Sequence, residues 1–245
     1  MKNVFKLLAR EIEDYRTLMR NVPCLAFVLF VISVVLMNLL ANKEIYTGLD
    51  WLALDCGLLM SWLSFLCMDM LTRRFGARAS IKLSMIAIAV NLFVCMVLYF
   101  ISKVPGNWGE YYATNNTIVN DALNNTIGGT WYVLMGSTIA LAVASVVNAL
   151  TNAGLGKIFS GDGFKSYAVR SYVSTLLAQF VDNFVFSLIV SHNFFGWSLL
   201  QCVTCSVTGC LVELICEVVF SPIGYKICKQ WETDKVGIGY LEREQ

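Results

Sequence analysis

The stretch "FLCMDMLTRRFGARAS", residues 65–80, passes from an apolar run into a basic cluster. Asp69 lies inside the apolar run, and Arg73, Arg74 and Arg78 follow within ten residues. This change is typical of a membrane helix that ends at the headgroup region, where basic side chains are favourable. The stretch therefore predicts a membrane span, in which the carboxylate of Asp69 is tolerated because arginines lie one helical turn away.

The rest of the chain repeats this apolar character. Of its 245 residues, 57% are hydrophobic and only 14% are charged, whereas a soluble domain carries about 25% charged residues. Apolar segments of about 20 residues recur, and each is long enough to cross a hydrocarbon core about 30 Å thick. We therefore predict an all-α, polytopic integral membrane protein that forms a single domain over residues 1–245. Its six predicted transmembrane helices are 23–42, 51–71, 82–102, 131–151, 170–191 and 196–227.

The basic residues predict the orientation of these spans. All of the 18 Lys and Arg except Lys43 and Lys103 fall on one side of the predicted membrane. The positive-inside rule then places both termini in the cytoplasm, which requires an even number of spans. Residues 1–21 are predicted to form a cytoplasmic amphipathic helix on the membrane surface. Residues 103–130 form a long outer loop in this prediction, and residues 228–245 form a cytoplasmic tail.

Polar side chains inside the spans predict an internal cavity. An acid at the centre of a membrane helix costs about 2.5–3.5 kcal/mol, so three acids facing lipid would together cost close to 10 kcal/mol. Because no Lys or Arg lies in the middle of a span, buried carboxylates there would take up protons or bind a cationic or hydrogen-bond-donating ligand. The alternative is that the polar groups only join helix to helix. The residues that share inward faces are Asn38, Asn42, Gln179, Asp182, Asn183, Phe186, Glu213 and Glu217.

Other classes of site find little support in the sequence. The nine cysteines lie in or beside apolar spans, and His192 is the only histidine, so neither a metal site nor a cofactor is predicted. The H-E-x-x-H and G-x-S-x-G motifs and the Walker motif are absent, so we predict neither an enzyme nor an ATPase. The net charge of +1 gives no reason to expect binding to nucleic acid. The predicted partners are a small molecule and the lipid bilayer.

Small residues in the span 131–151 predict close helix packing. Ser137, Ala140, Ala144 and Ser145 have the small-xxx-small spacing that lets membrane helices approach each other. Packing inside the bundle and a homodimer seam both fit this pattern.

Four segments, in order along most of the chain, resemble the vitamin uptake transporter family. They are "NLLANKEI" (38–45), "MDMLTRRFG" (68–76), "RSYVSTLLAQFVDNFVF" (170–186) and "SPIGY" (221–225). The second is similar to the family's D-x-x-x-R-x-F-G, and the third to its R-x-x-x-S-x-x-x-x-Q/N-x-x-D. The residues that carry these two motifs are Asp69, Arg73, Phe75, Gly76, Arg170, Ser174, Gln179 and Asp182.

The resemblance implies a function, since characterised members of that family import queuosine precursors. It implies a multi-pass importer of 7-deazaguanine bases or nucleosides in a bacterial plasma membrane, working as a secondary transporter. Because no ATPase signature is present, the energy source would be either an ion gradient, with protons taken up by Asp182 or a Glu of the last span, or trapping of the substrate. The base edge would bind Gln179, Asp182 and Glu213, with Asn38 and Asn42 closing the other side. Phe186, Phe184 and Trp62 are the candidate aromatic walls.

Some residues depart from the family pattern or have another role. Glu213 stands where the family often has Lys, which leaves the exact ligand open. Asp69 and Arg73 are four residues apart, so we predict that they pair at the cytoplasmic mouth, as a gate latch or as a structural link. Arg170 is assigned to the same group of gate or structural residues.

A second function fits the same sequence. The chain could be the substrate-binding membrane subunit of an energy-coupling-factor vitamin importer, which requires separate ATPase partners. Such a subunit needs a docking face of small residues, for which Ala140 and Ala144 are the candidates. The remaining alternatives are an intramembrane enzyme, against which the missing catalytic motifs argue, and a scaffold without a ligand.

Overall fold

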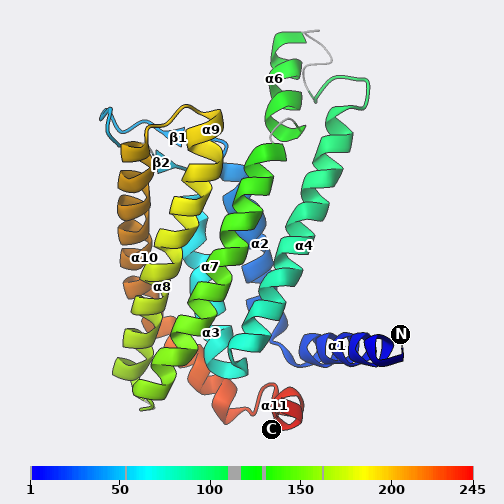
Figure 1. The fold of residues 1–245 in the computed structure, drawn as a ribbon, viewed down its shortest axis with the longest axis vertical. Helices are drawn as coiled ribbons and strands as arrows, with labels where there is room; N and C mark the ends of the chain where they lie inside the picture. Colours follow the sequence, from blue (N-terminus) through cyan, green and yellow to red (C-terminus); the bar gives the residue numbers. More distant parts are fainter. Residues whose placement is uncertain (1, 53, 110–116, 129–130, 162, 245) are drawn as a thin grey trace.

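The computed structural model describes residues 2–52, 54–109, 117–128, 131–161 and 163–244. Six long helices run along the bundle in this part of the chain (Figure 1). They are α2 (Cys24–Leu40), α3 (Leu58–Phe75), α4 (Ala77–Ser102), α7 (Trp131–Ile158), α8 (Phe164–Phe186) and α10 (Leu199–Thr233). The all-α class is thereby confirmed.

The remaining elements connect or flank these helices. The helices are α1 (Lys2–Asn21), α6 (Thr117–Gly128), α9 (His192–Phe194) and α11 (Ile238–Glu244), together with a π-helix, η1 (Ser187–Ser191). Two short strands, β1 (Glu44–Ile45) and β2 (Leu54–Asp55), pair antiparallel. The predicted outer loop therefore contains a helix, α6, and the predicted tail is helical through the end of α10 and α11. Residues 110–116 and 129–130 of the predicted loop lie outside the described residues.

The number of spans depends on α2 and α3. By length and apolar composition, the helix segments that contain α4, α7, α8 and α10 can cross a membrane, and α2 together with the end of α1 forms a fifth candidate with a bend of 107°. Helix α2 has 17 residues, and α3 contains Asp69, Arg73 and Arg74. The protein is therefore a polytopic membrane protein with four or five such candidate spans in the described chain, and six stays a prediction. Both termini lie at the same end of the bundle, as an even number requires (Figure 1).

The bundle buries many polar side chains and exposes many large apolar ones. Asn148, Ser174 and Gln179 are fully buried, whereas Phe93 and Ile215 are each 64% exposed. Large apolar side chains spread over the outer surface would be unfavourable in water, whereas they are favourable in contact with lipid acyl chains. The buried polar groups are consequently directed into the interior.

Small residues explain how closely α7 packs inside the bundle. Ala140 and Ala144 are both fully buried, and Ser137 and Ser145 are nearly so. The reading as intramolecular packing is therefore the right one. Because these four side chains are buried in the bundle, a homodimer or an ATPase partner would have to contact other surfaces, and both partners stay predictions.

Two sequence signals set helix boundaries near the site. Gly76 has φ 85°, a left-handed conformation that glycine adopts without steric cost, and it lets α4 start directly after α3 ends. Ser198 and Gln201 form a reciprocal capping box at the start of α10. The predicted span 51–71 begins too early, because residues before Leu58 belong to the β1–β2 hairpin and its turns.

Helix α1 lies across the end of the bundle and is held there by ion pairs. Lys82 in α4 contacts Glu11 at 2.8 Å and also pairs with Asp14. The hydrogen bond and charge of Lys82 lower the pKa of the Glu11 carboxyl from its usual 4.5. A lowered carboxyl pKa means that this contact stabilises the packing of α1 at neutral pH and loses that effect as the pH falls through the lowered value.

Lys82→Ala should release α1 from the bundle. Losing hydrogen bonds to charged groups, with Asp14 left only 15% exposed, costs about 1.5–3 kcal/mol, so amide hydrogen exchange in α1 should accelerate about tenfold or more. The control is Lys157→Ala, which removes an exposed lysine at the end of α7. Equal exchange in α1 for both variants would contradict the assigned role of Lys82.

Candidate functional site

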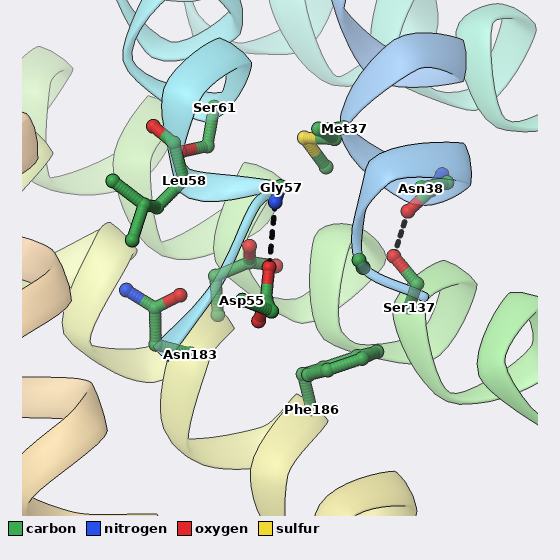
Figure 2. Close-up of a pocket in the computed structure, with 11 residues that line it drawn as sticks. Met37, Asn38, Asp55, Gly57, Leu58, Ser61, Ser137, Asn183 and Phe186 are labelled. Atoms are coloured by element: carbon green, nitrogen blue, oxygen red, sulfur yellow. Dashed lines mark hydrogen bonds between the residues drawn. The ribbon is translucent and has the colours of Figure 1, made fainter. Parts of the chain in front are cut away.

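A small pocket with a cavity volume of about 30 Å³ lies between α2, the β1–β2 hairpin, α3, α7 and α8 (Figure 2). Ligand pockets usually measure about 300–1,000 Å³, so this one holds only a water molecule or two and must widen to admit a larger ligand. Its lining residues are Met37, Asn38, Ala41, Asp55, Gly57, Leu58, Ser61, Ser137, Asp182, Asn183 and Phe186.

The hairpin brings Asp55 into this pocket (Figure 2). The Asp55 Oδ1 accepts a hydrogen bond of 2.7 Å from the backbone N–H of Gly57, which is the Asx-type turn that an Asp-x-Gly sequence favours. The hairpin itself is held to the start of α10. Trp197 Nε1 donates to Glu44 Oε1 at 2.8 Å, and Thr204 Oγ1 donates to the carbonyl oxygen of Trp51 at 2.7 Å.

Two buried polar atoms of the pocket have no hydrogen-bond partner among the described residues. Ser137 Oγ donates to Asn38 Oδ1, which leaves the Asn38 amide nitrogen as an unused donor. Asp182 Oδ1 is an unused acceptor. An unsatisfied buried polar group costs about 1–3 kcal/mol, so a ligand or water that satisfies these atoms gains that free energy.

Glu213 lies behind the pocket on α10 and is 1% exposed. Its Oε1 accepts a hydrogen bond from Ser61, and its Oε2 accepts one of 3.2 Å from Asn183 Nδ2. Ser61 and Asn183 both line the pocket. Glu213 therefore positions two lining side chains from helices α3 and α8, and it does not line the pocket itself.

Gly209 gives the Asn183 amide its space. A Cβ at position 209 would lie 2.8 Å from Asn183 Nδ2, which is the mobile end of a side chain. Gly209→Ala should therefore leave the fold intact and push the amide away from Glu213, and losing that charge-assisted hydrogen bond should weaken ligand binding about tenfold. The measurement is ligand affinity together with the thermal unfolding midpoint. Gly154→Ala is the control, because a Cβ there meets open space. Unchanged affinity for Gly209→Ala would contradict this position for Asn183.

A second polar cluster surrounds Asp69, which is fully buried. Asn148 Nδ2 donates to Asp69 Oδ1 at 2.6 Å. Ser171 and Thr175 donate to Oδ2 at 2.6 and 3.0 Å. Ser171 Oγ also forms a hydrogen bond with Glu217 Oε1. This cluster joins α3, α7, α8 and α10 and none of its residues lines the pocket.

The predicted pair of Asp69 and Arg73 is wrong. Asp69 bonds to neutral side chains of α7 and α8, as described above. Arg73 instead lies 3.9 Å from Glu232 and over the ring of Tyr167 at 5.4 Å from its centroid. Neutral donors from neighbouring helices satisfy the carboxylate of Asp69 in place of the arginine.

Arg170, assigned to the same group, lies near the Asp69 cluster. Its Nη2 donates to Asn152 Oδ1 at 3.0 Å, and its Nε donates to the Asn152 carbonyl oxygen at 3.3 Å. Asn152 Nδ2 in turn lies 3.3 Å from Ser174 Oγ. Arg170 therefore links α7 to α8 beside this cluster.

The structure divides the predicted substrate residues into three groups. Asn38, Asp182, Asn183 and Phe186 line the pocket, and Glu213 positions its lining residues. Glu217 belongs to the Asp69 cluster. The remaining two are outside both. Asn42 donates to the Leu39 carbonyl at 3.1 Å, and the buried Gln179 amide has no hydrogen-bond partner in the described part of the chain.

Two of the predicted aromatic walls lie elsewhere. Trp62 stacks on Phe220 at a centroid distance of 4.4 Å, and Phe184 stacks on Phe180 at 5.8 Å. Only Phe186 of the three lines the pocket. The prediction that Trp62 and Phe184 form its walls is therefore wrong, because each ring is already packed against another aromatic ring.

Sequence reasoning also missed lining residues. Asp55, Ser61 and Ser137 were not among the predicted site residues, although the Asp-x-Gly turn signal at 55–57 pointed to an ordered turn there. For metals, no group of three or more His, Cys, Asp or Glu that could hold an ion occurs among the described residues.

Comparison with known proteins identifies the family. No curated protein and no solved structure matches the chain. A family model described as "Putative vitamin uptake transporter" matches residues 55–227, which is well over half of the chain. This range includes most of the pocket and the whole Asp69 cluster. The chain therefore belongs to this vitamin uptake transporter family, and it is a multi-pass membrane protein of the vitamin-uptake type.

Proposed function

We propose that the chain imports a queuosine precursor, a 7-deazaguanine base or its nucleoside, across a bacterial plasma membrane for salvage into transfer RNA. It acts as a secondary transporter that is driven by protons. Membership of a vitamin uptake family supports transport of a small molecule. The sequence motifs that resemble importers of queuosine precursors support this class of substrate.

The observation that carries the proposal is the pair of unused polar atoms in the pocket. Asp182 Oδ1 offers an acceptor, and the Asn38 amide nitrogen offers a donor. A guanine-like edge presents N–H donors next to a carbonyl acceptor, so one flat base can satisfy both atoms once the pocket widens to admit it. The ring of Phe186 at the same pocket offers an aromatic surface for the base.

The acidic residues around the pocket support the proposal that protons drive transport. Asp55, Asp182 and Glu213 lie at or behind the pocket, and none of them takes part in an ion pair that the described residues show. Buried carboxylates without a basic partner are stabilised by taking up a proton or a cationic group. A proton gradient is thus a source of energy that the chain itself is equipped to use.

Uptake into cells tests the proposal. Bacteria that can neither make nor import the 7-deazaguanine base should accumulate labelled base when they express this chain, and an agent that collapses the proton gradient should stop accumulation. The control is the same cell with an empty vector. No uptake of base or nucleoside would contradict the substrate assignment. Uptake that needs added ATPase partners would identify the alternative, the membrane subunit of an energy-coupling-factor importer.

A further inference from the structure

Ser171 lies between two buried carboxyl groups. Its Oγ is 2.6 Å from Asp69 Oδ2 and is also hydrogen-bonded to Glu217 Oε1. A serine hydroxyl has one hydrogen to donate. It can therefore donate to only one of the two carboxyls, and the other carboxyl must carry a proton in order to donate to the serine oxygen. The geometry requires one proton on this pair.

The hydrogen bonds show which carboxyl is ionised. Asp69 accepts from Asn148 at 2.6 Å and from Thr175 at 3.0 Å, in addition to Ser171. An ionised carboxylate is an acceptor only, and several donors directed at it stabilise the charge. Asp69 is therefore the ionised member of the pair.

Glu217 has the opposite surroundings. It is fully buried, its only hydrogen bond among the described residues is to Ser171, and its Oε2 has no partner there. An isolated carboxylate in such a place would have to be neutralised. Glu217 is therefore the member that carries the proton, which it donates to Ser171, while Ser171 donates to Asp69.

The other ionisable groups near Glu217 do not supply a counter-charge. Cys67 of α3 and Tyr167 of α8 interact electrostatically with it, and both are neutral groups. The basic side chains nearest the cluster are engaged elsewhere. Arg73 faces Glu232 and the Tyr167 ring, and Arg170 binds Asn152.

We propose that Glu217, Ser171 and Asp69 form a proton-binding site that is separate from the substrate pocket. When the site transfers its proton, the Glu217 proton passes to the Ser171 oxygen as the Ser171 hydrogen passes to Asp69. One proton thus moves from α10 to α3, and Glu217 becomes the carboxylate. Asp69 lies less than two turns before the end of α3 at Phe75, which directs this transfer towards the end of the bundle where both termini lie.

Helix α10 links this site to the pocket. Glu213 lies one turn before Glu217 and bonds to Ser61 and Asn183 of the pocket lining. A change in charge at Glu217 therefore acts on the same helix that positions two pocket side chains. As a coupling device the site rests on the proposed transport function, but its proton can be measured without transport.

Infrared spectroscopy tests the site directly. A protonated buried carboxyl gives a C=O stretching band that a carboxylate lacks. The wild-type chain at neutral pH should show such absorption. Glu217→Gln should lose the component that Glu217 contributes, seen in the difference spectrum against the wild type, and Ser171→Ala should shift that component. Glu217→Gln should keep the fold, because the Gln amide can still donate to Ser171. The matched control is Glu232→Gln on the same helix, which removes a partly exposed, ion-paired acid and should leave the band unchanged.

Transport in liposomes tests the coupling. With an inward proton gradient, the wild type and Glu232→Gln should concentrate labelled base, whereas Glu217→Gln should reach only the outside concentration. An unaltered infrared band in Glu217→Gln, or no band in the wild type, would overturn the proton site even if transport occurs. Concentration by Glu217→Gln equal to that by the wild type would overturn its coupling role. The expected band without any transport of base would support the site and contradict the proposed function instead.

Discussion

Replacing Asp182 with Asn should weaken binding of the 7-deazaguanine base roughly 10- to 150-fold and lower uptake to match. The Asp182 Oδ1 is an unused acceptor in the pocket, and a hydrogen bond to a charged group contributes about 1.5–3 kcal/mol. The Asn amide keeps the size of the side chain but weakens its acceptor and adds a donor that faces the N–H groups of the base. The measurement is equilibrium binding of labelled base to the purified variants.

The control for this experiment is Asp50→Asn. Asp50 is exposed and lies in the turn between the two hairpin strands. Asp50→Asn is therefore the same chemical change, made outside the pocket. Its binding should equal that of the wild type. If Asp182→Asn binds the base as tightly as Asp50→Asn does, the base does not use Asp182 and the pocket is not its site.

Replacing Asp69 with Leu should lower the free energy of unfolding by about 3–5 kcal/mol, because each buried donor that loses its acceptor costs about 1–3 kcal/mol. The change leaves the hydrogen-bond donors of Asn148, Ser171 and Thr175 without their acceptor. Since these donors come from α7 and α8, the loss separates three helices at once. The measurement is reversible unfolding in detergent micelles.

Asp50→Leu serves as the matched control, because it removes an exposed acid. A surface change of this kind alters the free energy of unfolding by only about 0.5 kcal/mol. If Asp69→Leu were no less stable than Asp50→Leu, the cluster would contribute little to the fold.

The helices near the site were predictable because membrane spans need no tertiary information. A run of about 20 apolar residues must be a helix in lipid, whatever its neighbours are. Asp182, Asn183 and Phe186 were predictable for the same reason, since they share part of one helix, α8, whose polar side had to face inward. These three residues all line the pocket.

Asp55 could not be placed by the same reasoning. It follows an apolar segment that reads as the start of a membrane helix, yet residues 54–55 pair with residues 44–45 in a hairpin. Strand pairing depends on the partner segment, which periodicity within one segment does not reveal. The hairpin therefore places the Asp55 carboxylate in the pocket, although the sequence pattern had assigned this residue to a membrane span.

Glu213 and Glu217 show a second limit. Four residues separate them, so they share one helix face, but they also lie about 6 Å apart along the axis. That distance is enough for Glu213 to contact Ser61 and Asn183, and for Glu217 to contact Ser171 instead. Helical periodicity predicts the side of a helix on which a residue lies. It cannot predict which residue of a neighbouring helix that side chain contacts.

The most direct test of the central claim is uptake of labelled 7-deazaguanine base by the purified chain alone in liposomes, with an inward proton gradient. The account predicts saturable uptake that the Asp182→Asn variant loses. Uptake that is absent without added ATPase partners, or that is equal in the wild type and Asp182→Asn, would contradict it.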